Sequence, residues 1–152
     1  MSRLSREALA NVTRSVLETA VFLFCDDVPM GAEPLKGDVI EAVIRFEAAT
    51  SGQIALRLPR NLGLEAAANL LGVEADDPDA QESAMAAVAE LLNMISGSAL
   101  KEWFGAQARW SLGVPATAEF LGRLPTGRPQ SVAFVVDESP LEIEVVELGA
   151  PT

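Results

Sequence analysis

Glu90 and Asn93 are two residues whose types and spacing could do chemistry together. They stand three positions apart in a stretch that predicts a helix, so both side chains fall on one face, about one turn apart. Apolar neighbours such as Leu92 and Ile95 place the pair at or near the edge of a buried face. The pattern also fits an ordinary exposed edge, or an asparagine bonded to a nearby loop, because E-x-x-N is a short and common string.

The sequence contains no histidine, and this limits the chemistry that the pair could join. Histidine phosphotransfer, Ser-His-Asp and Cys-His nucleophile systems and most zinc hydrolase sites are excluded. Any reaction must use carboxylates, amides, hydroxyls or bound ions. Cys25, the single cysteine, lies in an apolar run and is better explained as a small buried hydrophobe than as a reactive thiol.

The composition predicts one globular domain over residues 1–152, with 49% apolar residues. A formal net charge of −11 argues against binding to nucleic acid and to an anionic membrane surface. We find no apolar stretch of about 18 residues and no signal peptide, so we expect no membrane insertion and a cytoplasmic location. The acidic segment 74–82 lacks the spacing of a calcium loop and is interpreted as a solvated turn.

The helix that carries the pair is the dominant predicted element, and we expect it over residues 80–104. Asp77 or Asp79 can serve as its N-cap, and Pro78 suits its first turn. Gly97 interrupts the helical pattern. A glycine at this position could allow another backbone to pack closely against the helix.

The remaining elements predict an α+β fold, an antiparallel sheet with helices packed on one face. In chain order we expect a helix at 4–24, strands at 39–46 and 53–58, a short helix at 61–71, the long helix, and strands at 109–114, 117–121, 131–136 and 141–148. In the last strand, Glu142, Glu144 and Glu147 are interpreted as the solvent-facing side.

The run at 89–99, AELLNMISGSA, resembles the signature helix of the CheC, CheX and FliY family of chemotaxis phosphatases. In that family an E-x-x-N pair is followed by Met-Ile, a small residue and glycine, and all these positions match. The hairpin at Gly52 and the short helix ending at Gly72 are also similar, so the resemblance covers about residues 5–148. A single E-x-x-N helix looks more like the CheX branch than like CheC, which usually carries two.

The resemblance implies a hydrolase, a phosphatase of the aspartyl phosphate on a CheY-like response regulator in chemotaxis or two-component signalling. Asn93 would orient the hydrolytic water, and Glu90 would pair with the regulator's lysine beside the phosphate. The transition state is loose, so a catalyst contributes mainly through positioning and charge placement, and an amide can both donate to and accept from a water. No cofactor or metal of the chain's own is implied, because the Mg²⁺ would belong to the regulator.

A second interpretation stays open, because the family often has Asp or Ser four residues before the glutamate and this chain has Ala86. The chain could be a CheX-like binding or dimerisation module that has kept the fold and is weak or inactive as an enzyme. A homodimer is expected under both interpretations, since the family often pairs through edge strands and the strand at 141–148 offers such an edge.

Overall fold

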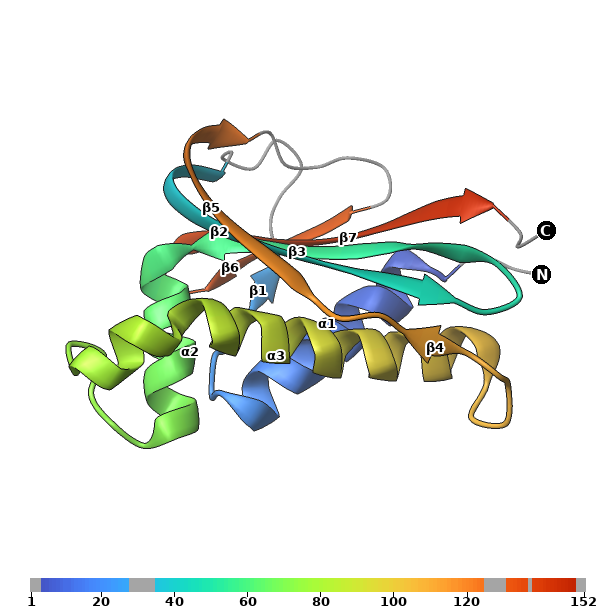
Figure 1. Ribbon diagram of the computed structural model, residues 1–152, viewed down its shortest axis with the longest axis horizontal. Coiled ribbons are helices and arrows are strands. Elements are labelled where there is room, and N and C mark those ends of the chain that lie inside the picture. Colours follow the sequence, from blue (N-terminus) through green and yellow to red (C-terminus); the bar gives the residue numbers. More distant parts are fainter. Residues whose placement is uncertain (1–3, 28–34, 125–130, 137, 150–152) are drawn as a thin grey trace.

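The structure is a computed structural model that describes residues 4–27, 35–124, 131–136 and 138–149. Among these residues, three helices pack on one side of a seven-stranded antiparallel sheet (Figure 1). The strand order is β1-β6-β7-β3-β2-β4, and β5 also pairs with β2. The predicted α+β fold is therefore confirmed.

The helices are α1 (Arg6–Ala20), α2 (Arg60–Leu71) and α3 (Pro78–Phe104). The strands are β1 (Asp26–Asp27), β2 (Leu35–Glu47), β3 (Ser51–Pro59), β4 (Ser111–Leu112), β5 (Ala116–Leu124), β6 (Ser131–Val136) and β7 (Ser139–Gly149). The prediction located every helix and the long strands. It did not include β1, and it made β4 longer than the two residues that pair with β2.

Helix α1 ends earlier than predicted because the chain turns at Phe22. This residue has a φ of 57°, in the left-handed region that non-glycine residues rarely occupy. The Leu23 N–H bonds to the Leu17 carbonyl at 3.0 Å, which also accepts from the Val21 N–H at 3.3 Å, so the chain folds back over the last turn of the helix. At the other end, the Ser5 hydroxyl accepts from the Ala8 N–H at 3.0 Å, as expected for an N-cap.

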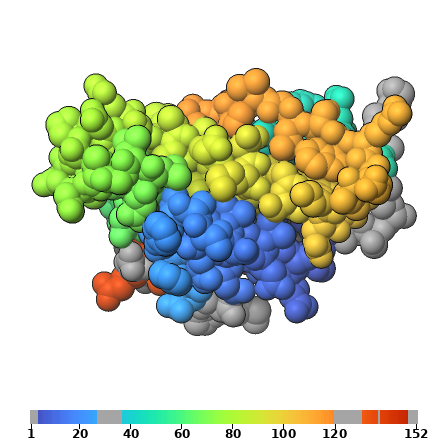
Figure 2. Space-filling view, turned by 90° about the horizontal axis from the view of Figure 1, so that it is seen from below, coloured from blue at the N-terminus to red at the C-terminus, as the bar shows by residue number. Residues whose placement is uncertain are grey.

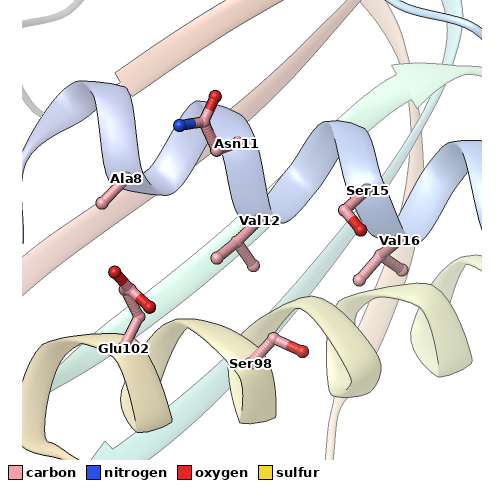
Figure 3. A pocket seen from close by; sticks show the side chains of 7 residues that line it. All are labelled: Ala8, Asn11, Val12, Ser15, Val16, Ser98 and Glu102. Atoms are coloured by element: carbon pink, nitrogen blue, oxygen red, sulfur yellow. The ribbon is translucent and has the colours of Figure 1, made fainter.

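Helix α3 is the centre of the helical layer. In the space-filling view of the helical side, its surface runs between α1 and the segment that leads into β4 and β5 (Figure 2). Helix α1 lies alongside α3, with Val12 and Val16 facing Ser98 across the gap (Figure 3). Helix α2 packs against the N-terminal half of α3.

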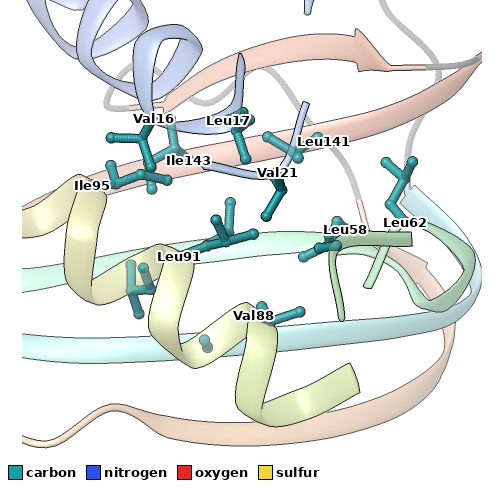
Figure 4. Packing of buried hydrophobic residues seen from close by; sticks show 14 of the residues in the cluster. Val16, Leu17, Val21, Leu58, Leu62, Val88, Leu91, Ile95, Leu141 and Ile143 are labelled. Carbon is teal, nitrogen blue, oxygen red and sulfur yellow. The ribbon is translucent and has the colours of Figure 1, made fainter. Parts of the chain in front are cut away.

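The core lies between α3, α1 and the sheet. From α3, Val88, Leu91 and Ile95 are fully buried and meet side chains of α1, β3 and β7 such as Leu17 and Ile143 (Figure 4). Burying each large apolar side chain stabilises the fold by roughly 1.5–3 kcal/mol. The inner face of α3 is therefore fixed, and with it the direction of its outer face.

By length and composition alone, α3 is also apolar enough to cross a membrane, which the sequence analysis did not expect. Half of the most apolar 18-residue window is buried inside the folded domain. The core helix of a folded domain produces the same signal, and the packing of α3 on the sheet accounts for its apolar character.

The expectation of an exposed terminal strand at 141–148 is wrong for the first part of β7, where β6 pairs with Ser139–Glu144. Beyond Glu144, β7 pairs with β3 alone among the described strands. Among the described strands, the sheet ends at β1 on one side and at β4 and β5 on the other.

The interpretation of Glu142 and Glu144 as solvent-facing is also wrong. Their exposed fractions are 1% and 5%, whereas Glu147 is exposed as predicted. Both carboxylates bond to Arg57 on β3, at 2.9 Å for Glu142 and 3.0 Å for Glu144. Glu41 on β2 accepts from the Arg57 Nε at 2.6 Å. One guanidinium on β3 thus joins carboxylates from the two strands that flank it, β2 and β7.

The electrostatics of Arg57 follow from this arrangement. Burial by itself would lower the pKa of the guanidinium, but hydrogen bonds to Glu41 and Glu144 and the charges of these carboxylates raise it above its ordinary value. A charge pair of this kind is costly to break, because the remaining partners stay buried without compensation.

We expect Arg57→Met to destabilise the protein by about 3–5 kcal/mol at pH 7, because it leaves Glu142 and Glu144 charged, buried and without this cation. Urea unfolding followed by circular dichroism measures the change. The matched control is Arg45→Met on β2, where the arginine is exposed and the expected loss is below about 0.5 kcal/mol. Equal losses for the two variants would contradict the structural role of Arg57.

Burial also determines the behaviour of Cys25, which is 8% exposed. Desolvation, followed by the charge of Glu18, raises the pKa of its thiol to about 11. The pKa of the thiol is thus higher in the folded protein than in the unfolded chain. The protonated thiol therefore contributes its full stabilisation at pH values below the unfolded pKa, and this stabilisation is lost as the pH rises through about 11.

At pH 8 we therefore expect the folded protein to react with a thiol reagent such as DTNB at least about 100-fold more slowly than the urea-unfolded chain. The absorbance of the thiolate released from DTNB measures the reaction rate, and the variant Cys25→Ala gives the background signal. Rapid labelling of the native protein would show that the thiol is accessible.

Candidate functional site

The candidate site is the outward face of α3. Glu90 and Asn93 are both exposed, while the residues between them, Leu91 and Leu92, have exposed fractions of 0%. The two leucines hold the helix against the core, and the two polar side chains leave it on the opposite side. The sequence predicted this division, and the structure brings Glu90 and Asn93 onto one accessible face.

The N-terminal end of α3 fixes where the helix begins. The Asp77 side chain accepts from the Asp79 N–H at 2.8 Å, and Pro78 occupies the first turn, as the sequence predicted. At the other end, the Gly105 N–H bonds to the Lys101 carbonyl at 2.9 Å. The pair therefore lies well inside a 27-residue helix and away from ends that could fray.

Neither candidate side chain is engaged inside the described part of the domain. Within the part of the chain that the structure describes, Glu90 and Asn93 take part in no hydrogen bond or ion pair. This removes the alternative in which Asn93 serves to hold a neighbouring loop. A carboxylate and a carboxamide that are exposed and free can both be used by a docking partner.

The surroundings of the pair carry little charge. Helical spacing places Ala86, Met94, Gly97 and Lys101 on the same side of α3 as Glu90. Ala86 and Met94 are exposed, Met94 at 37%. At Ala86 and Gly97, before and after the pair, the helix presents only a methyl group and a hydrogen on this side.

Within the described chain, no other backbone packs closely on Gly97. A Cβ built at Gly97 meets nothing within 4 Å. By contrast, a Cβ at Gly63 would lie 2.9 Å from the Ile40 side chain, which is a true close approach. Gly97 therefore faces open space beside Asn93.

A hollow of about 250 Å³ lies between α1 and α3, and neither Glu90 nor Asn93 lines it. Its polar lining consists of Asn11, Ser15, Ser98 and Glu102 (Figure 3). The volume is below the roughly 300–1,000 Å³ of typical small-molecule pockets. Sequence reasoning missed these residues because no motif in either helix signals that the two helices lie side by side.

The other sequence candidates are not brought to the site. Cys25 is buried, as interpreted. Trp103 packs edge-on against Phe46, with ring centroids 5.6 Å apart, and so helps to anchor the end of α3 on β2. In the described residues, the acidic side chains of segment 74–82 form no group that could hold a metal ion.

Solved structures show what class of protein this fold and surface define. A chemotaxis protein CheX from Desulfovibrio desulfuricans gives a TM-score of 0.71 at 20% identity, over 91% of this chain and 95% of that chain. A chemotaxis protein CheX from Vibrio vulnificus gives 0.71 at 18% identity, over 91% and 95%. A CheX-CheY-BeF3-Mg+2 complex from Borrelia burgdorferi gives 0.66 at 20% identity, over 95% and 99%. The fold is that of the chemotaxis protein CheX.

A sequence model of the family described as "Chemotaxis phosphatase CheX" matches residues 40–122, more than half of the chain and a range that includes Glu90 and Asn93. This chain belongs to the CheX family of chemotaxis phosphatases. The resemblance seen in the α3 motif is thereby confirmed. A comparison with curated protein sequences gave no match.

Proposed function

We propose that this protein is a phosphatase that hydrolyses the aspartyl phosphate of a CheY-like response regulator in the cytoplasm. One observation carries the proposal: Glu90 and Asn93 are exposed and unengaged on a helix that Leu91 and Leu92 fix in the core. The family description supports the reaction, and the Borrelia burgdorferi complex of CheX with CheY, BeF3 and Mg+2 supports the kind of partner.

Asn93 orients the hydrolytic water. Its carboxamide oxygen accepts a hydrogen bond and its NH₂ group donates, so one side chain can fix a water in both position and direction. Phosphoryl transfer passes through a loose transition state. A protein therefore accelerates the reaction mainly by aligning the attacking oxygen with the phosphorus. The side chain is neutral, so it can enter a phosphate pocket without adding negative charge.

Glu90 docks the helix. Its carboxylate pairs with the lysine beside the regulator's phosphate, one turn of α3 away from the water held by Asn93. An exposed carboxylate on a chain of net charge −11 also favours approach to a cation. The Mg²⁺ that neutralises the phosphate is bound by the regulator, so the chain contributes no metal ligand and no cofactor.

We expect Asn93→Ala to reduce the stimulated dephosphorylation by about 100-fold, because the water loses its alignment. Phosphate release from a purified phosphorylated receiver domain measures the rate, and binding should stay within about threefold. Asn61→Ala is the matched control, because Asn61 is exposed on α2 and bonds only weakly, at 3.4 Å, to Ser139. A variant Asn93→Ala with full activity would refute the assignment.

Glu90→Gln keeps the shape of the side chain and removes its charge. We expect a higher KM and a weaker dependence of the affinity on ionic strength than in the wild type, since one exposed ion pair with the partner is lost. Titrations at low and at physiological salt measure both quantities. Because Glu90 is exposed and unbonded, the free energy of unfolding should change by less than about 0.5 kcal/mol. Identical salt dependence of the two proteins would exclude the ion pair.

Ala86 favours a second candidate function, a binding module of the same fold. It is exposed one turn before Glu90 and offers only a methyl group at a position where the resemblance leads us to expect a polar side chain. A binding module would hold the regulator without faster loss of phosphate, and Ala86→Asp would then introduce or raise the activity. A homodimer is compatible with both functions, and the part of β7 beyond Glu144 pairs with β3 alone among the described strands.

A further inference from the structure

Gly97 stands where a helix is least expected to have a glycine. It lies inside the 27-residue α3, between the exposed Met94 and Lys101. Glycine in a helix interior loses more conformational freedom on folding than alanine and weakens the helix. A residue that weakens the central helix calls for a reason elsewhere in the structure.

The packing of the described chain supplies no such reason. Gly72 and Gly105 have positive φ values of 72° and 94°, which favour glycine at helix ends. A Cβ at Gly52 would lie 2.3 Å from the Val146 carbonyl oxygen, and one at Gly63 would clash with Ile40. At Gly97 no positive φ occurs, and apart from the neighbouring backbone of α3 no described atom lies within 4 Å of an added Cβ.

The position of Gly97 links it to the candidate site. It follows Asn93 by four residues and Glu90 by seven, which places all three on one side of α3. The next residue, Ser98, lines the hollow between α1 and α3 (Figure 3). The half-buried backbone of Gly97 therefore carries no side chain on the docking face, one turn from the side chain proposed to hold the water.

We propose that Gly97 is a contact point for the main chain of the regulator. A loop of the receiver domain beside its phosphorylated pocket rests on the α3 backbone at Gly97, closer than any Cβ would permit, and this contact sets how deeply Asn93 enters the pocket. The inference rests on the proposed function and extends it. A single methyl group would hold the partner back by about 1.5 Å, the length of one bond. A displacement of about 1 Å at the reacting atoms can cost about 100-fold in rate.

Because a side chain added at Gly97 meets no neighbour in the described chain, substitutions there should change function without lowering stability. Gly97→Ala and Gly97→Leu should each raise Tm by about 2–4 °C, since alanine and leucine are better helix formers and meet no neighbour. Gly97→Leu should weaken binding at least tenfold and reduce the stimulated rate about 100-fold. Gly97→Ala should reduce the rate about tenfold, with a smaller change in affinity.

The probes are the receiver domains encoded in the same genome, charged with beryllofluoride and Mg²⁺ for binding and phosphorylated for rates. Gln81→Leu is the matched control, because Gln81 is exposed on α3 but lies nine residues before Glu90, on the opposite side of the helix. Its affinity and rate should equal those of the wild type.

Three results overturn the inference. If Gly97→Leu binds and acts like the wild type while Asn93→Ala loses its rate, the proposed function stands and the Gly97 contact is wrong. If Gly97→Leu lowers Tm, Gly97 serves the packing of the chain itself. If the wild type neither binds any charged receiver domain nor speeds its dephosphorylation, the proposed function fails and the contact falls with it.

Discussion

The burial of one face of α3 is the constraint on which the rest of this structure depends. Val88, Leu91, Leu92 and Ile95 are fully enclosed between the sheet and the other helices. Since the side chains of a helix are rigidly spaced around its axis, fixing the inner face also fixes the outer face. The direction of Glu90 and Asn93 is thus set by apolar packing on the far side of the helix. The side chains of Glu90 and Asn93 themselves make no hydrogen bond or ion pair within the described domain.

This arrangement gives a site without a cavity. The small hollow between α1 and α3 is lined by neither residue of the pair, and both side chains are exposed on the surface of α3. In the proposed reaction the partner supplies the concave half, with the phosphate, the Mg²⁺ and the lysine, and this chain supplies one carboxylate and one carboxamide. Such a division suits a chain without histidine, because the added contribution is position rather than nucleophilic or acid–base chemistry.

The two sides of the sheet are stabilised by different forces. Toward the helices the sheet presents apolar side chains such as Leu56 and Ile143, which form the core. Elsewhere on the same strands, Arg57 joins Glu41, Glu142 and Glu144 across β2, β3 and β7. The strand register brings these charges together, because Arg57 stands directly opposite Glu41 in the β2–β3 pair and opposite Glu142 in the β3–β7 pair. The ion cluster therefore also favours this register over a slip by one residue, which would separate the charges.

The sequence by itself determined the features that depend on near neighbours along the chain. Helical periodicity, the Asp77 cap and the β2–β3 hairpin predicted the elements, and the E-x-x-N spacing predicted that Glu90 and Asn93 share a face. Only the tertiary structure decided that β7 lies between β3 and β6, that Glu142 is buried, and that Gly97 faces open space. The physical reason is distance along the chain. Arg57 and Glu142 are 85 residues apart, and no local pattern specifies which strands become neighbours or what stands opposite a given Cα.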